Sequence, residues 1–141
     1  MEIQYTVVGI PKPQARPKVF HRTLKSGRAF VHTYSPKSDW FNLVYTETLK
    51  QKEKLKERLS GALQLNLLFF LPIPKSISKK KRESLRYVSK RPDVDNLAKA
   101  VMDAMNNTGI WEDDSQIARL DIVKAYGEEP KCIITLIQLE G

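Results

Sequence analysis

The sequence predicts an α+β fold, in which a small mixed β-sheet and two main helices form a single domain. Residues 63–71 are an almost continuous apolar run, which predicts a central strand covered on both faces. Residues 35–61 and 93–109 carry apolar side chains at roughly helical spacing. Residues 117–126 and 131–139 have the composition of two further strands. The 141 residues suffice for one hydrophobic core and leave no room for a second domain.

The N-terminal part of the chain predicts a strand, a loop and a hairpin in that order. Apolar residues alternate over residues 3–7, which predicts a strand ending at Gly9. Three prolines make residues 11–18 an extended basic loop, because proline cannot continue a helix and restricts the residue before it. Residues 19–31 are then expected to form a hairpin about a turn at residues 25–28.

The remaining elements are bounded by capping and turn residues. The first helix is expected to start with Ser35 as its N-cap and Pro36 at its first position, and to stop at Gly61. Residues 78–85 predict a short basic helix or loop. The two C-terminal strands are expected to form an antiparallel pair joined at residues 127–130.

Charge is distributed unevenly along the chain. The formal net charge is +8, which favours nucleic acid as a partner through neutralisation of phosphates. Residues 12–37 and 75–91 are strongly basic, whereas residues 93–121 are acidic. Two basic segments therefore bracket an acidic one. The expected phosphate contacts are Lys12, Arg16, Lys18, Lys79, Lys80, Lys81 and Arg82.

The acidic segment has the residue types that metal-dependent chemistry on phosphate requires. Asp93 and Asp95 are two residues apart, so on an extended backbone their carboxylates share a face. Asp95, Lys99 and Asp103 follow at intervals of four, which is one stripe of a helix. Two further aspartates, Asp113 and Asp114, follow a turn that contains Gly109. Carboxylate oxygens suit Mg²⁺ or Mn²⁺, and a cation such as Lys99 could neutralise a phosphate oxygen.

A purely structural interpretation of the same residues stays open at this stage. Asp93 or Asp95 could be the N-cap of the second helix, which is expected to run to about Asn107. The stripe of charges could be a ladder of surface ion pairs, and Asp113 could shape a turn. The complete pattern D-x-D-N-x-x-K followed by W-x-D-D-x-Q favours function over structure.

Residues 91–105 and 109–117 closely resemble the signature of the RusA family of Holliday-junction resolvases, which is found in bacteria and often carried by prophages. The proline-rich basic loop at residues 9–17 is also similar, whereas residues 19–90 offer no residue-level match. The resemblance implies a homodimeric, Mg²⁺-dependent endodeoxyribonuclease. Such an enzyme nicks two opposing strands of a four-way DNA junction in recombination and repair. The approximate two-fold symmetry of a junction is consistent with a dimer.

The resemblance also implies roles for individual residues. The metal-binding, catalytic carboxylates of the family fall on Asp93, Asp95 and Asp114, and its catalytic lysine falls on Lys99. Asp113, beside the motif position, could support or replace a metal ligand.

Five other residues are expected to be structural. Asp103 is assigned to a helix position that faces solvent or a basic partner, and Asn96 is expected to cap or orient. Trp111 is expected to anchor the returning turn in the core. His21 and His32 are interpreted as hairpin residues rather than ligands, because the site is already rich in oxygen.

The cellular setting is an expectation from composition. The single cysteine, Cys132, lies in an apolar run and is expected to be buried and to form no internal disulfide. No signal-peptide pattern and no apolar run long enough for a bilayer is visible. We therefore expect a cytoplasmic protein, associated with the nucleoid when on DNA and without a membrane partner.

Two alternative functions stay open. One is a non-catalytic nucleic-acid-binding protein whose acidic cluster is a structural or regulatory ion site. The other is a nuclease of the same chemistry that acts on forks, flaps or RNA. The two differ from the leading hypothesis in whether Mg²⁺ or Mn²⁺ promotes nicking and in which substrate is nicked.

Overall fold

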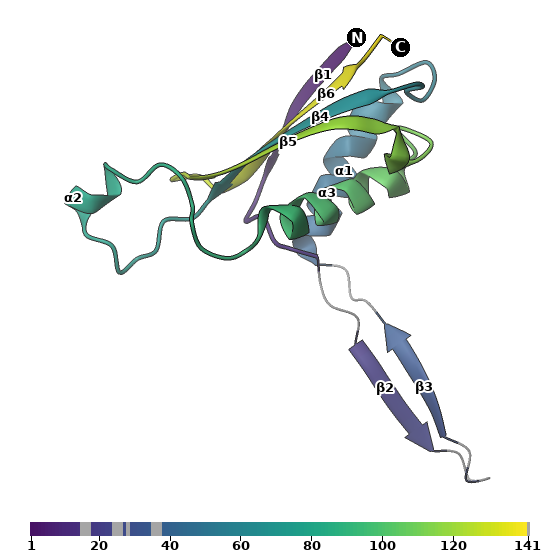
Figure 1. The fold of residues 1–141 in the computed structure, drawn as a ribbon, viewed down its shortest axis with the longest axis horizontal. Coiled ribbons are helices and arrows are strands. Elements are labelled where there is room, and N and C mark those ends of the chain that lie inside the picture. The colour runs from purple at the N-terminus through teal and green to yellow at the C-terminus, as the bar shows by residue number, and fades with distance from the viewer. Residues whose placement is uncertain (15–17, 24–26, 28, 35–37, 141) are drawn as a thin grey trace.

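The computed structural model describes residues 1–14, 18–23, 27, 29–34 and 38–140. Figure 1 shows a mixed sheet with helices packed on it, and a two-stranded hairpin beyond one end of α1. The elements in chain order are β1 (Glu2–Val8), β2 (Lys18–Thr23), β3 (Ala29–Tyr34), α1 (Asp39–Glu53), β4 (Leu63–Leu71), α2 (Lys79–Arg82), α3 (Val94–Thr108), the 3-10 turn η1 (Asp114–Gln116), β5 (Ile117–Tyr126) and β6 (Lys131–Gln138). The predicted α+β class with a mixed sheet is confirmed, and α2 adds a third, short helix.

The sheet has the strand order β1-β6-β4-β5. β6 is antiparallel to both β1 and β4, whereas β4 and β5 are parallel. The predicted strand at residues 63–71 therefore is central, as expected. A parallel pair requires a long crossover connection, and the segment between β4 and β5 carries α3 across one face of the sheet.

The predicted antiparallel pairing of the two C-terminal strands is wrong, because β4 lies between β5 and β6. The loop between them crosses the end of β4, where the backbone N–H of Gly127 donates to the carbonyl of Leu71 (3.0 Å). A Cβ at Gly127 would lie 2.9 Å from the side chain of Phe70, so this close crossing requires glycine. Strands that are neighbours in sequence can therefore be separated in the sheet by one strand.

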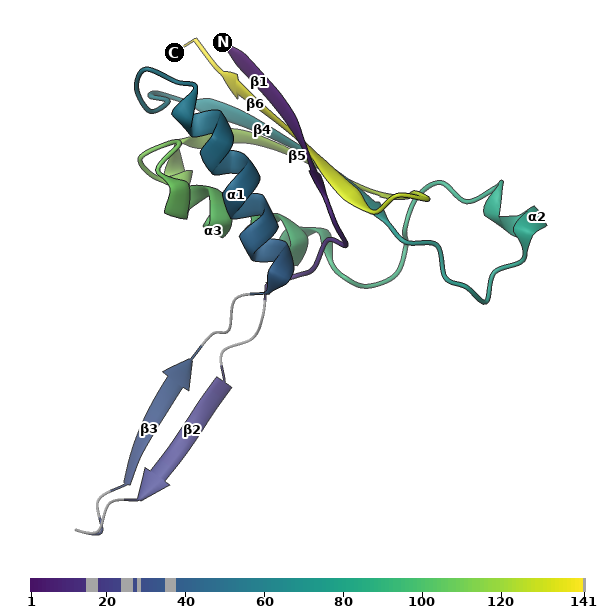
Figure 2. The same cartoon turned by 180° about the vertical axis from the view of Figure 1, so that it is seen from behind.

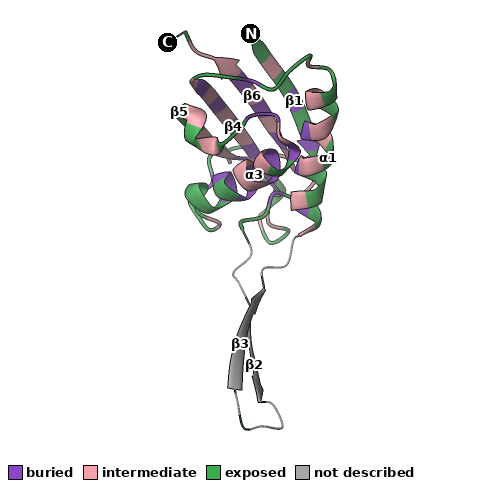
Figure 3. Ribbon diagram, turned by 90° about the vertical axis from the view of Figure 1, so that its right-hand side faces the viewer, coloured by how far each residue is buried: buried purple, intermediate pink, exposed green. Residues whose placement is uncertain are grey.

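The prediction that β4 is covered on both faces is also wrong. Burial alternates along β4, with Leu65, Leu67 and Phe69 buried and the residues between them only half-buried. Figure 3 shows α1 and α3 together on one face of the sheet. The run of apolar residues suggested burial on both faces because the opposite, open face also carries apolar side chains, among them Leu68 and Phe70.

Helix α1 is shorter than predicted at both ends. Its N-cap is Ser38, whose Oγ accepts from the backbone N–H of Phe41 (3.1 Å), and not Ser35, which lies with Pro36 outside the described residues. The helix ends at Glu53 instead of continuing to Gly61. Apolar spacing was misleading here because the buried Leu59 belongs to an extended segment, where its N–H donates to the carbonyl of Ile110 (2.8 Å).

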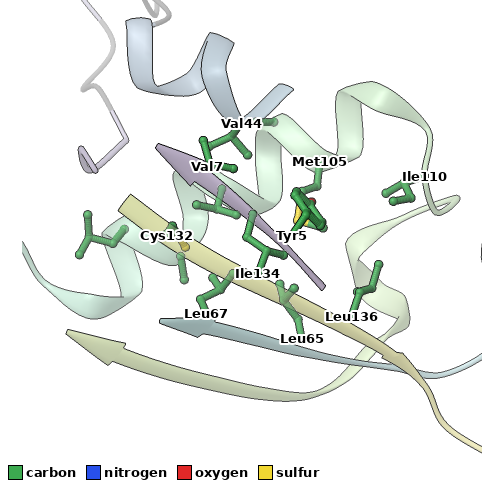
Figure 4. Close-up of a cluster of buried hydrophobic side chains, with 14 of the residues drawn as sticks. Tyr5, Val7, Val44, Leu65, Leu67, Met105, Ile110, Cys132, Ile134 and Leu136 are labelled. Atoms are coloured by element: carbon green, nitrogen blue, oxygen red, sulfur yellow. The ribbon is translucent and has the colours of Figure 1, made fainter. Parts of the chain in front are cut away.

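The hydrophobic core lies between the two helices and the covered face of the sheet (Figure 4). Tyr5 of β1 and Thr48 of α1 are joined by a buried hydrogen bond between their hydroxyl groups (2.7 Å). Trp111 is fully buried, as predicted. Cys132 is buried as well, and this burial raises the pKa of its thiol, so the thiolate that a nucleophile needs is disfavoured.

The hairpin and α2 extend from the body of the molecule in different directions (Figure 2). The predicted hairpin is confirmed as the antiparallel pair β2–β3, and His21 and His32 fall on its two strands. Most of its predicted turn, at residues 25–28, lies outside the described residues. The short basic helix is confirmed as α2. None of the helices described is long and apolar enough to span a membrane.

Candidate active site

Helix α3 presents the first two acids of the motif. The helix runs from Val94 to Thr108 and is capped by Gly109, whose positive φ of 74° is the left-handed conformation that glycine favours. Leu97 and Val101 bury one face, so the polar residues are left on the other. Asp93 occupies the N-cap position, but its side chain makes no capping hydrogen bond. Its exposed carboxylate, like that of Asp95, is therefore available to a ligand.

The segment that leads into Asp93 is held by Lys124, a residue that sequence reasoning missed. Its ammonium Nζ donates to the carbonyl oxygens of Lys90 (2.7 Å) and Pro92 (2.8 Å). Lys124 comes from β5, so the sheet fixes the backbone from which Asp93 projects. Lys124 and Pro92 are 32 residues apart, so no pattern of neighbouring residues in the sequence could have shown that they are in contact.

Asp113 and Asp114 have different surroundings, although they are neighbours. Asp113 is the N-cap of η1, and its Oδ2 accepts from the backbone N–H of Ser115 (3.0 Å). This hydrogen bond lowers the pKa of Asp113, and together with Gln116 it completes a capping box. The turn-forming interpretation of Asp113 is therefore confirmed.

Asp114 instead faces α3, where Asn106 holds it. Nδ2 of Asn106 donates to Oδ2 of Asp114 (3.1 Å), and Oδ1 of Asn106 accepts from the indole N–H of the buried Trp111. The indole can only donate, so it fixes which end of the Asn106 amide faces Asp114. Sequence reasoning assigned no role to Asn106, although it lies eleven residues after Asp95 on the same helix, three turns further on.

Asp103, predicted to face solvent or a basic partner, is partly exposed and lies within the electrostatic influence of Lys99, and it also contacts the loop after β1. It is half-buried, and its Oδ2 accepts from Nε2 of Gln14 (2.6 Å). Burial raises the pKa of Asp103, and the nearby charge of Asp114 raises it further, whereas Lys99 and the hydrogen bond from Gln14 lower it. Asp103 is covered in part by the loop after β1, which is tied to α3 through Gln14. The spacing of residues along a helix does not reveal such a contact.

The ladder of ion pairs that was the alternative interpretation of the charged stripe on α3 is not formed. The ion pairs found in the described part of the chain join Lys50 to Glu47 and Lys131 to Glu129. Lys99 is exposed, and it acts on Asp103 through the electrostatic attraction of its charge and not through an ion pair. Its ammonium group is therefore free to meet an external anion.

A family model described as Endodeoxyribonuclease RusA matches residues 9–137. The chain belongs to the RusA endodeoxyribonuclease family. The match extends through residues 19–90, where the motif comparison found no residue-level similarity. Membership of this family therefore rests on most of the chain and not on the acidic motif alone.

Two relatives accompany this family match. The "Uncharacterized protein YqaN" of Bacillus subtilis (strain 168) is 33% identical over 145 residues, which cover 99% of this chain and 98% of the relative. The "Crossover junction endodeoxyribonuclease rusA" of Lactococcus phage r1t is 30% identical over 93 residues, or 66% of this chain and 67% of the phage protein.

The oxygen donors of the site fit a hard divalent cation. Within the described ranges, no three His, Cys, Asp or Glu side chains converge to hold a metal between them. Mg²⁺ does not need such a cage, because it commonly keeps water and takes one or two carboxylates together with substrate phosphate. Asp93 and Asp95 are exposed. Asp114 accepts a hydrogen bond through Oδ2, so its other carboxylate oxygen is available to a cation.

The predicted phosphate contacts lie in different parts of the molecule. Lys12 is exposed on the loop next to Gln14, whereas Arg16 and the side chain of Lys18 lie outside the described residues. The other four form α2, where the lysines are exposed and Arg82 is half-buried with Nε bonded to the carbonyl of Ile77 (3.2 Å). Among the predicted contacts whose side chains the structure describes, Lys12 lies on the loop that Gln14 ties to α3, whereas the other four lie on the separate helix α2.

Proposed function

We propose that this chain is a Mg²⁺-dependent endodeoxyribonuclease that resolves Holliday junctions by paired nicks in opposing strands, in DNA recombination and repair. Mn²⁺ is expected to replace Mg²⁺. The observation that supports the proposal is the hydrogen bond that holds Asp114 of η1 to Asn106 of α3 in a RusA-family chain. The same helix bears Asp95 and Lys99.

The residues divide the chemistry between them. Asp93, Asp95 and Asp114 would supply the oxygen ligands, and the bound cation would supply a Lewis acid for the scissile phosphate and its attacking water. Lys99 offsets the negative charge that grows on the phosphate oxygens, because its exposed ammonium has no acid paired with it among the described residues. Asn106 keeps the carboxylate of Asp114 in one orientation.

Four-way DNA is proposed as the substrate for two reasons. The net charge of +8 favours a polyanion, and the phage relative carries the name of a crossover junction endodeoxyribonuclease. A homodimer would place two such sites on equivalent strands of a two-fold symmetric junction. We therefore expect a particle of twice the chain mass of 16.2 kDa by light scattering after gel filtration.

One gel tests the proposed function. Four-way, three-way, flap and linear DNA and a matched RNA are incubated with the chain in Mg²⁺ or in EDTA. We expect paired nicks in the four-way junction, in Mg²⁺ alone. The variant Asp95→Asn should bind the junction at least as tightly as the wild type but not nick it, because a repulsive charge and a ligand are removed together. Asp121→Asn, which removes an exposed acid on β5, is the matched control and should nick normally.

The outcomes separate the remaining alternatives. Binding to branched DNA without any metal-dependent nicking would identify a non-catalytic binding protein. Preferred nicking of flaps, three-way forks or RNA would retain the chemistry and change the substrate. Lys99→Ala should lower the single-turnover rate by about two orders of magnitude with little effect on binding. An unchanged rate would remove Lys99 from the chemistry.

A further inference from the structure

A cleft lies beside Asp93, between the loop that follows β1 and the start of α3. Its volume of about 480 Å³ is in the range of sites that hold small organic ligands. Pro11, Pro13 and Pro92 form part of its wall. Proline rings offer apolar faces whose position is fixed by the backbone, so this wall needs no rearrangement to receive a flat group.

The cleft is held in shape by contacts within the protein. The backbone N–H of Gln14 donates to the carbonyl of Asn96 (3.3 Å). The side-chain amide of Gln14 donates to Asp103 (2.6 Å), farther along the same helix. Both the backbone and the side chain of Gln14 are thus tied to α3. Because the wall is already ordered, a ligand would lose little affinity to ordering it.

Two polar side chains at the cleft are free to meet a ligand. Arg91 and Asn96 are exposed, and their side chains make no hydrogen bond or ion pair with any residue that the structure describes. A guanidinium group matches the geometry of a phosphate. A carboxamide offers one donor and one acceptor side by side, which is the arrangement that recognises the edge of a nucleobase.

We propose, on the basis of the proposed function, that this cleft takes the nucleotide next to the scissile phosphate with its base unstacked. Asp93 lines the cleft, and Asp95 immediately precedes Asn96. A phosphate positioned at these carboxylates therefore places the adjoining nucleotide at the cleft. The proline rings contact the face of the base, Asn96 reads its edge, and Arg91 contacts its phosphate. A base that leaves the stack needs such an apolar wall together with a polar group for its edge.

The proposal makes the cleft a determinant of base preference at the cut. Nick positions are first mapped on a four-way junction. Each of the four bases, or an abasic residue, is then placed at each nucleotide flanking the nick. Single-turnover rates are measured in Mg²⁺ with the full chain. We expect the best base to be cut about tenfold faster than the abasic residue, the discrimination expected of one good side-chain-to-base contact.

Two asparagine variants on α3 separate the cleft from a general effect on the helix. Asn96→Ala should reduce the ratio between the best base and the abasic residue to about twofold, because the group that reads the base is removed. Asn107→Ala removes an exposed asparagine near the far end of the same helix and should keep the wild-type ratio. Equal wild-type rates on all five substrates would overturn the proposal, and so would a wild-type ratio in Asn96→Ala.

A second measurement does not require cleavage. The fluorescence of 2-aminopurine rises when this base leaves the stack, so it is placed in turn at each nucleotide that flanks the strand-exchange point of the junction, and the chain is bound in EDTA. We expect a larger rise there than at a label farther along the same arm, and an equal rise at both would overturn the proposal. If the chain nicks no substrate in Mg²⁺, the proposed function fails. The fluorescence then still decides whether the cleft takes a base.

Discussion

Single side chains decide how the candidate site is held together. Asn106 contacts both the buried Trp111 and the acid Asp114, so one amide links the core to a proposed metal ligand. Gln14 holds Asp103 in a similar way from the loop after β1. Neither residue is acidic or basic, and neither would be chosen as catalytic from its type. Their importance lies in the hydrogen bonds that orient acidic neighbours.

At this scale we predict that Asn106→Leu weakens Mn²⁺ binding by about tenfold or more, because partners that orient metal ligands typically contribute this much. Asp114 loses its donor, and the indole of Trp111 loses its acceptor. Isothermal titration calorimetry with Mn²⁺ measures the affinity without DNA. Asn107→Leu, on the exposed side of the helix, is the control. An affinity for Mn²⁺ that stays unchanged in Asn106→Leu would contradict the role given to Asn106.

At the scale of elements, the site is assembled by contacts between segments that are distant in sequence. Lys124 of β5 holds the backbone just before α3, and Tyr5 of β1 is hydrogen-bonded to Thr48 of α1. Apolar burial alone would let these elements slide, since it has no direction. The polar contacts fix where one element lies on the next.

Lys124→Met tests the hold on the segment before Asp93. It removes two charge-assisted hydrogen bonds to backbone carbonyls, so we expect the free energy of unfolding to fall by about 1–3 kcal/mol. Urea unfolding followed by circular dichroism gives this value, and the nicking rate on junctions should fall too, since Asp93 loses its support. Lys56→Met, at an exposed position after α1, provides the comparison. A variant as stable and as active as the wild type would show that the segment needs no such anchor.

The link between β1 and α1 can be measured with a double-mutant cycle. Tyr5→Phe and Thr48→Val each leave one buried hydroxyl without its partner and should each cost about 1–3 kcal/mol of unfolding free energy. The double variant has no orphaned hydroxyl, so its cost should be smaller than the sum of the single costs. Strictly additive costs in thermal and urea unfolding would show that the two hydroxyl groups do not interact.

At the scale of the whole molecule, charge is separated between the body and its projections. The acids lie on α3 and η1, whereas α2 gathers four basic residues at the end of a loop that leads back to α3 (Figure 1). A polyanion would be attracted to the basic parts and repelled by the acids until a cation is present. This arrangement is expected of a protein that brings phosphate to metal.

Salt dependence tests whether α2 meets DNA. Replacing Lys79, Lys80 and Lys81 with glutamine should reduce the slope of log affinity against log salt by about 0.9 for each phosphate that is no longer neutralised. Lys54→Gln/Lys56→Gln/Arg58→Gln removes the same charge from exposed positions after α1 and should change the slope less. Fluorescence anisotropy with a labelled junction gives both slopes. Equal slopes for the two triple variants would mean that only net charge matters.

The sequence by itself determined the local features of this protein. The bounds of β4 and of α3 follow from apolar pattern, prolines and a closing glycine within about one residue. The acidic motif follows from residue type and spacing, and its resemblance to a known signature indicated the family that the family model confirms. Local patterns suffice for these features because each depends on contacts between residues a few positions apart. The end of α1 at Glu53 was missed because the buried Leu59 follows the helical spacing without being helical.

Only the tertiary structure decided how these parts meet. It inserted β4 between β5 and β6, left one face of the sheet open, and joined Asp103 to Gln14 of the loop after β1. Gln14 lies 89 residues from Asp103, and Lys124 lies 32 from Pro92. Such contacts depend on the packing of whole elements, and no periodicity within one element records which partner it will meet.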